Sequence, residues 1–242
     1  MYWGYPLDVS KPSKPAVFLV SGGMDSAVVL AAGARDGFEA HALTVNYGQR
    51  HACELEAADR VCRAAGVLEH RTVDVNLAAL GGSALTSEVA VPKGRGPSEI
   101  GAGVPVTYVP ARNALFLTIA LGWAEMLGAS DLFCGVNAVD YSGYPDCRPE
   151  FLRAFEQLAA QATAAGTERG VEFRVHAPLL DLSKSGIVEL GHDLGVDFAL
   201  THTCYDPEQQ GETWLSCGAC DACTLRLAGF REAGCEDPIA YA

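Results

Sequence analysis

One stretch near the N-terminus constrains the fold more than any other, because a short apolar run, a glycine loop and a helix start follow one another directly. Residues 16–20 form a continuous apolar run, as in a strand buried on both faces of a parallel sheet. The loop of residues 21–26 comes next, and residues 27–35 have the pattern of a helix. A strand–loop–helix unit of this kind predicts an α/β domain.

The same alternation of apolar runs and amphipathic stretches continues along the chain. Further strands are predicted at residues 41–45, 70–75, 130–135 and 172–176, and further helices at 53–65, 111–127, 149–165, 183–195 and 221–232. Strands that alternate with helices are joined by right-handed crossovers, which predicts a doubly wound, mostly parallel sheet. The chain has 242 residues, 49% of them hydrophobic, which is enough for one substantial core.

This pattern divides the chain into three parts. We predict an N-terminal lead-in at 1–15, an α/β domain at 16–200 and a C-terminal segment at 201–242 that contains four clustered cysteines. Within the α/β domain, residues 81–105 are rich in glycine and proline and poor in large apolar side chains. A loop of this length predicts either a lid or binding loop, or a disordered surface insertion.

The charge of the chain bears on its partners. The formal net charge is −13, and affinity for nucleic acid rests mainly on Lys and Arg, so we expect no nucleic-acid partner. A small anion can still bind, because a local pocket can be positive on a negative protein. No apolar run reaches the length of a membrane helix and no signal-peptide stretch precedes residue 16, so we expect no membrane partner and a cytoplasmic location.

The glycine loop has the features of a phosphate-binding loop. Gly22 and Gly23 let a phosphate approach the backbone closely, and successive N–H groups at a helix start can point at one anion. The loop lacks the lysine of a Walker A loop and the spacing of a dinucleotide-binding loop. Asp25 would repel a bare phosphate, so it indicates either a bridging Mg²⁺ or a helix cap. The alternative is an ordinary glycine-rich turn.

The cysteines near the C-terminus indicate a metal site. Cys217, Cys220 and Cys223 are separated by two residues each, and Cys204 lies upstream. Four thiolates close a tetrahedral zinc site, which would be structural because no coordination position stays open. Such a site also needs backbone N–H donors around the sulfurs. A redox Cys-x-x-Cys pair and an iron–sulfur centre are the alternatives, and zinc is favoured.

Taken together, these motifs resemble a known family. The loop resembles that of the PP-loop ATP pyrophosphatase superfamily, and the whole chain from about 16 to 235 is similar to the 7-cyano-7-deazaguanine synthase family. Four further strings carry this resemblance, at residues 47–51, 109–113, 135–148 and 178–184. Residues 206–216 depart from the family by lengthening the gap between the first cysteine and the other three, and the lead-in is also longer.

The resemblance implies an adenine nucleotide α-hydrolase-like fold, which is Rossmann-like, and an ATP-dependent carbon–nitrogen ligase. In the implied reaction, 7-carboxy-7-deazaguanine and ammonia give 7-cyano-7-deazaguanine through adenylated carboxylate and amide intermediates, releasing AMP and diphosphate. The implied cofactors are ATP, magnesium and one structural zinc per chain, and the implied assembly is a homodimer. An enzyme that stops at the amide and a PP-loop tRNA thiolase are the enzymatic alternatives, and a non-catalytic nucleotide- or zinc-binding module is the third.

The site residues follow position by position from the same resemblance. The residues expected at the nucleotide are Val20, Ser21, Gly22, Gly23, Met24, Asp25, Ser26, Ala27, Val28, Val29 and Leu30. The residues expected in catalysis are Lys184, Arg112, Asp25 and Ser26. For Lys184 and Arg112 the alternative is a solvated surface cation, and the resemblance favours the catalytic role. The residues expected at the deazaguanine ring are Asp140, Tyr141, Tyr144, Asp146 and Arg148, for which ordinary turn chemistry is the alternative.

Overall fold

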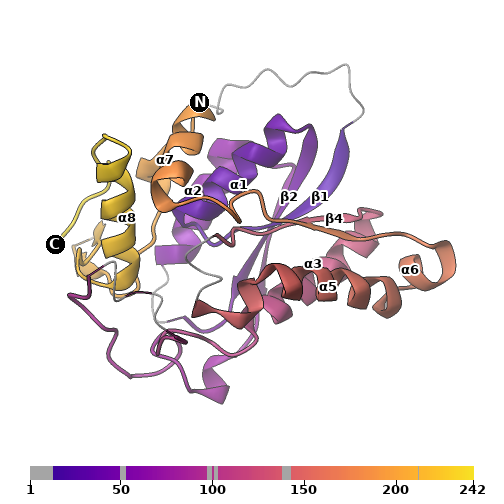
Figure 1. Cartoon of the computed structure of the whole chain (residues 1–242), viewed down its shortest axis with the longest axis horizontal. Helices are drawn as coiled ribbons and strands as arrows, with labels where there is room; N and C mark the ends of the chain where they lie inside the picture. The colour runs from indigo at the N-terminus through magenta and orange to yellow at the C-terminus, as the bar shows by residue number, and fades with distance from the viewer. Residues whose placement is uncertain (1–12, 50–52, 97–99, 101–102, 138–142, 212) are drawn as a thin grey trace.

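The structure of the protein is a computed structural model. The structure describes residues 13–242 apart from 50–52, 97–99, 101–102, 138–142 and 212. A twisted sheet runs through the molecule with helices on both of its faces, and the C-terminal helix stands at one end (Figure 1).

The sheet has five strands in the order β3-β2-β1-β4-β5, and all neighbouring strands are parallel. The strands are β1 (Lys14–Leu19), β2 (Phe38–Asn46), β3 (Glu69–Asp74), β4 (Asp131–Phe133) and β5 (Arg174–His176). In the register of the central strand, Phe18 lies opposite Ala42 on β2 and Phe133 on β4. The predicted fold class, a doubly wound, Rossmann-like parallel sheet, is therefore confirmed.

Helices cover the two faces of the sheet. On one face lie α1 (Met24–Arg35), α2 (Cys53–Ala65) and α7 (Lys184–Asp193), and on the other lie α3 (Arg112–Leu127), α5 (Pro149–Ala162) and α6 (Ala164–Arg169). α8 (Asp221–Glu232) packs beside α7, and the short 3₁₀ turns are η1 (Ala78–Leu80), η2 (Pro145–Cys147) and η3 (Phe198–Leu200). A two-stranded antiparallel hairpin, β6 (Glu208–Gln210) and β7 (Thr213–Leu215), completes the C-terminal segment.

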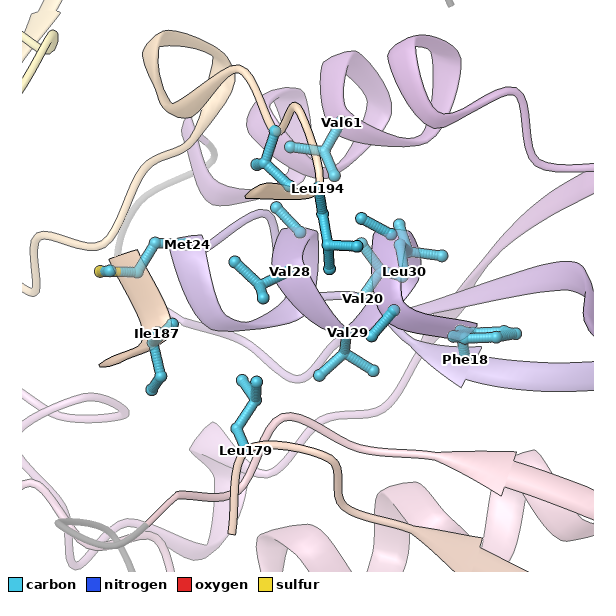
Figure 2. Packing of buried hydrophobic residues seen from close by; sticks show 14 of the residues in the cluster. Phe18, Val20, Met24, Val28, Val29, Leu30, Val61, Leu179, Ile187 and Leu194 are labelled. Atoms are coloured by element: carbon cyan, nitrogen blue, oxygen red, sulfur yellow. The ribbon is translucent and has the colours of Figure 1, made fainter. Parts of the chain in front are cut away.

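The main core surrounds α1. Figure 2 shows Val28 and Leu30 of this helix packed among Val61 of α2 and Leu194, which follows α7. Phe18 of β1 stacks on Phe133 of β4, with 4.2 Å between the ring centroids. Nearly every residue of α1 is thus fixed by apolar packing, which holds the loop before it in one place.

The structure differs from the sequence expectations at several boundaries. α1 begins at Met24 instead of residue 27, so the second half of the glycine loop is the first turn of the helix. The helix predicted at 149–165 breaks at Thr163, whose hydroxyl accepts a hydrogen bond from the Gly166 N–H and starts α6. The hairpin at 208–215 fills the lengthened gap between the cysteines and was not predicted.

No helix in the described part of the chain is long and apolar enough to cross a membrane.

Candidate functional site

The site lies at the point where the strand order reverses, beyond the carboxyl ends of β1 and β4. Ligands of doubly wound sheets bind in the crevice at this position. A cavity of about 230 Å³ opens here. Its wall includes residues that follow β1, β2 and β4, the first turns of α1, α2 and α3, and a segment just before the cysteines.

The glycine loop is held against α2 by the absence of a side chain. Gly22 has a φ of +83°, and a Cβ built on it would lie 2.5 Å from the Ala58 nitrogen and 2.6 Å from the Glu54 oxygen. Gly23 begins the helix, and its oxygen accepts the N–H of Ala27. Only glycine fits this approach of loop to helix, so Gly22 is required for packing against α2, a role different from the predicted approach of a phosphate.

The backbone N–H groups of the loop keep donor capacity. Within the described chain, no backbone carbonyl accepts from the amides of residues 21 and 22 or of 24–26. The Gly23 N–H donates to the Ser21 hydroxyl at 3.3 Å, and the buried Ser26 hydroxyl donates to the Gly23 oxygen at 2.9 Å. The hydroxyls therefore shape the loop, and the amides at the start of α1 form a ready anion site.

Asp25 forms a partly buried ion pair beside the loop. Its Oδ2 accepts from the Lys184 Nζ at 2.6 Å and from the Asn137 Nδ2 at 3.2 Å. Its Oδ1 is buried, and no described residue donates to it. Asp25 does not cap α1, because no side-chain cap bond is present there. The carboxylate instead joins the loop to α7 and to the segment after β4.

Not every residue expected at the nucleotide reaches the cavity. The residues of this range that line the wall are Val20, Ser21, Gly23, Met24, Asp25 and Ser26. Gly22 lies against α2 and is not part of the wall. The remaining residues of the range are buried in the core around α1: Ala27, Val28, Val29 and Leu30. They position the loop from below and do not face the cavity.

The four cysteines converge as predicted. The Sγ atoms of Cys204, Cys217, Cys220 and Cys223 all lie within 4.8 Å of one another. A tetrahedral zinc with bonds of about 2.3 Å needs sulfurs about 3.8 Å apart, so the residues fit a metal ion. Hydrogen bonds from the thiols of Cys204 and then Cys223 lower the pKa of Cys220, which favours a thiolate.

The N–H donors expected around these sulfurs are present. The backbone amides of Asp206 and Cys217 donate to the Cys204 sulfur at 3.4 and 3.2 Å. The amide of Cys220 donates to the Cys217 sulfur at 3.3 Å, and that of Tyr205 to the Cys220 sulfur at 3.5 Å. Such donors offset the negative charge of four thiolates around one cation.

The described part of 81–105 packs over the cysteine cluster. The N–H of Gly94 donates to the Ala219 oxygen at 2.8 Å, and the Lys93 Nζ lies 2.8 Å from Asp206. Arg95 pairs with Asp221 at the start of α8. Of the two expectations for this stretch, the surface insertion is wrong for the described residues. The same part of the chain also reaches the cavity, because Leu85 lines the cavity wall.

The comparisons with known proteins agree on one family. Residues 15–234 match the family described as Queuosine biosynthesis protein QueC. The chain belongs to the QueC family. A 7-cyano-7-deazaguanine synthase from Xanthomonas campestris pv. campestris is 61% identical over 95% of this chain and 98% of its own. The synthase of that name from Paramagnetospirillum magneticum is 57% identical over 95% and 99%. These matches confirm the family that the motif strings predict.

Solved structures resemble this QueC chain more distantly. The NMN synthetase from Francisella tularensis aligns with a TM-score of 0.47 at 18% identity, over 81% of this chain and 68% of that chain.

A second polar group of this QueC chain lies across α2 and α3. Arg112 lines the cavity with its guanidinium 5.8 Å from the Tyr47 ring and 5.9 Å from the Phe116 ring. Burial works to lower the pKa of Arg112, but nearby phenols, Tyr47 first, outweigh it and raise that pKa. Burial raises the pKa of the Glu54 carboxyl to about 7, and Arg112 partly offsets this. Arg112 therefore stays charged beside a carboxyl that titrates near neutral pH.

The residues expected at the deazaguanine ring separate into three groups. Tyr144 and Asp146 line the cavity, but the Asp146 Oδ2 accepts the Asn113 N–H at 2.8 Å. Arg148 is exposed, is not part of the cavity wall, and precedes the first turn of α5. Asp140 and Tyr141 lie outside the described residues. Asp146 thus holds the start of α3, a contact between distant segments that neither the substrate role nor the turn-chemistry alternative predicts.

Several cavity residues were not among the sequence predictions. They are Glu54 and Tyr47 near α2, and His202, Thr203 and Tyr205 just around the first cysteine. Tyr47 is the first residue of the string 47–51 used for the family resemblance, and Glu54 lies three residues after that string, which was their only signal. His202, Thr203 and Tyr205 had no signal of their own, because their place at the cavity depends on the His202 N–H donating to the Gly22 oxygen at 2.9 Å.

Proposed function

We propose that this protein converts 7-carboxy-7-deazaguanine, ammonia and ATP to 7-cyano-7-deazaguanine, AMP and diphosphate. One observation carries the proposal: the open amides of residues 21, 22 and 24–26 stand beside a lysine–carboxylate pair at the switch point of the sheet. Membership of the QueC family and the names of its curated relatives supply the substrate class.

The reaction has four steps that share one site. A substrate carboxylate oxygen attacks the α-phosphorus of ATP, and diphosphate leaves with the electron pair of the broken P–O bond. Ammonia then attacks the acyl carbon, and AMP and a proton leave to give the amide. The amide oxygen attacks a second ATP and expels diphosphate. Loss of AMP and the remaining N–H protons forms the nitrile.

The chain contributes mainly orientation and charge stabilisation. The amides of residues 21–26 receive the departing diphosphate. Lys184 meets the charge that builds on the α-phosphate, and Asp25 holds its ammonium in place between reactions. Arg112 lines the cavity from the start of α3, where it receives the carboxylate or the carbonyl edge of the deazapurine.

Two metal ions fit residues of this chain. The orphaned, buried Oδ1 of Asp25 is a hard oxygen ligand suited to Mg²⁺, which would neutralise phosphate charge when bound. Four cysteine thiolates with N–H donors suit one zinc, which would hold the C-terminal segment folded. We further propose that the enzyme acts as a homodimer, as the family resemblance implies.

The stoichiometry of AMP and product tests this function. Purified protein is incubated with ATP, ammonia and 7-carboxy-7-deazaguanine, and the product is identified by mass. We expect two AMP for each nitrile. One AMP for each molecule of amide would instead identify an enzyme that stops at the amide. No AMP above a control without deazaguanine would reject the proposal.

A further inference from the structure

The cavity contains one carboxylate that the proposed mechanism does not use. Three carboxylates line its wall in the described chain: Asp25, Glu54 and Asp146. Asp25 is paired with Lys184, and Asp146 accepts the Asn113 N–H. Among the described residues, none donates a hydrogen bond to the carboxylate of Glu54. A ligand that fills the cavity would exclude water from this carboxylate, so the donors of the ligand would have to replace that water.

The surroundings of Glu54 suit a flat, hydrogen-bonding ligand. Its backbone is fixed, because the Glu54 oxygen lies against Gly22 of the loop. Arg112 lies close enough to act against the rise in the pKa of Glu54. Glu54 in turn lies close enough to Tyr47 to raise the pKa of that phenol. Phe116 and Tyr47 add aromatic surface to the same part of the wall. Acceptor, cation and aromatic rings therefore meet on one side of the cavity.

We propose that Glu54 is the specificity residue that reads the guanine-type edge of the substrate, accepting hydrogen bonds from its N1–H and 2-amino groups. This inference rests on the proposed function, because it assumes a 7-deazaguanine substrate. The edge presents two neighbouring donors and then the O6 acceptor. An ionised carboxylate offers two acceptors and no donor. Arg112 lines the same cavity and lies close enough to influence the charge of Glu54, so it is the group that would donate to O6.

The charge state of Glu54 agrees with this role. Burial raises the pKa of its carboxyl to about 7 in the empty cavity. Two donors from a ligand favour the ionised form, so binding the correct edge lowers that pKa and completes the pair. A ring that lacks these donors would leave the carboxylate buried and unpartnered, and the site would reject it.

The first test compares Glu54→Gln with wild type. The amide keeps the size of the side chain but turns one acceptor into a donor that opposes the 2-amino group. We expect the KM for 7-carboxy-7-deazaguanine to rise about 10- to 100-fold, with the KM for ATP and the zinc content unchanged. Glu56→Gln is the matched control, because Glu56 is an exposed residue in the same helix turn. It should change neither KM.

The second test uses 7-carboxy-7-deazahypoxanthine, which lacks the 2-amino group. Wild type should use it with a KM at least about 10-fold above that of the substrate. Glu54→Gln should lose or reverse this preference, because the deazahypoxanthine has no 2-amino group to oppose the amide of the glutamine. If the variant does not fold, the wild-type comparison alone decides, since equal KM values for the two rings would overturn the assignment.

The outcomes separate this inference from the proposed function. If wild type forms no AMP from the deazaguanine, the proposed function fails. If wild type turns over and Glu54→Gln keeps a normal KM for the deazaguanine, only the role of Glu54 fails. A rise in the KM for ATP alone would place adenine at Glu54 and would equally overturn the assignment.

Discussion

The glycine loop and the cysteine segment border the same cavity but are held in place by different forces. Nine of the twelve residues of α1 are buried in the apolar core. Around the cysteines, the buried cluster contains little besides Ala84, Val91, Ala222 and three of the four cysteines themselves. The loop is thus fixed by packing, whereas the cysteine segment has little apolar packing and is held by polar contacts around a four-cysteine cluster that fits a metal ion.

The polar contacts of the C-terminal segment are unusually complete. Arg226 is only 1% exposed, and its guanidinium bonds Asp237 at 2.6 and 2.9 Å and Thr201 at 2.7 Å. Gly229 of α8 approaches Lys184 so closely that a Cβ would lie 2.8 Å from the Lys184 Cβ. Lys184 of α7 therefore packs against this segment, so we expect the order of the segment to influence where Lys184 stands.

The largest expected effect comes from removing the metal. Structural zinc contributes about 10–16 kcal/mol of folding free energy in small zinc domains. We expect Cys220→Ser to lose zinc and to make residues 204–223 sensitive to limited proteolysis. Backbone amides of α1 should stay protected from hydrogen exchange, because apolar packing holds that helix.

The control for this comparison is Cys235→Ser, a partly exposed cysteine outside the cluster. It should retain one zinc and the protease resistance of wild type. A zinc-free Cys220→Ser protein that resists protease across 204–223 would show that the polar contacts alone hold the segment.

The next effect tests the packing of the loop. In Gly22→Ala, the methyl group meets the backbone of α2, and the residue must keep a positive φ. We expect a loss of about 3–5 kcal/mol in the free energy of unfolding, measured by urea titration. Gly82→Ala is matched in φ, at +85°, but meets no atom within 4 Å, so about 1–2 kcal/mol is expected. Equal losses would contradict the tight approach to α2.

A smaller effect separates chemistry from stability. Lys184→Met should lower the rate of AMP formation about 10²- to 10³-fold, equivalent to about 2.7–4 kcal/mol. It also leaves the Asp25 carboxylate without its cation. The double variant with Asp25→Asn should recover the thermal midpoint but not the rate. The control is Ser185→Ala, because this neighbouring serine lies outside the cavity wall. It should change neither the rate of AMP formation nor the thermal midpoint. A double variant with restored rate would remove Lys184 from the mechanism.

The smallest effect concerns a residue that the sequence placed at the substrate. Arg148 is exposed and lies outside the cavity wall. We expect Arg148→Ala to change the KM for 7-carboxy-7-deazaguanine by less than about two-fold, since isolated surface substitutions have small effects. A ten-fold rise would return Arg148 to the binding site.

Local patterns sufficed for much of this architecture. The buried strand, the glycine loop and the spacing of three cysteines are short-range signals, and each predicts a structure that the chain adopts. The break at Thr163 was missed because one hydroxyl there competes with the helix for backbone donors. The hairpin at 208–215 was missed because its strands are only three residues long.

The parts of the site that were missed depend on contacts between distant segments. Asp25 and Lys184 were both predicted as catalytic, yet no local pattern reveals that they pair across 159 positions. Residues 93–95 contact the cysteine cluster through Ala219 and Asp221, which lie more than 120 positions further along the chain. Glu54 has the sequence pattern of an ordinary acidic residue in a first helical turn, and only the cavity distinguishes it.

The most direct test of the account is a crystal structure with an ATP analogue whose α,β-bridging oxygen is replaced by methylene. The account predicts that the β- and γ-phosphate oxygens lie about 2.7–3.1 Å from backbone nitrogens of residues 21–26, with Lys184 turned from Asp25 toward the α-phosphate. A nucleotide bound elsewhere in the cavity, with those nitrogens bonded to protein carbonyls, would contradict it.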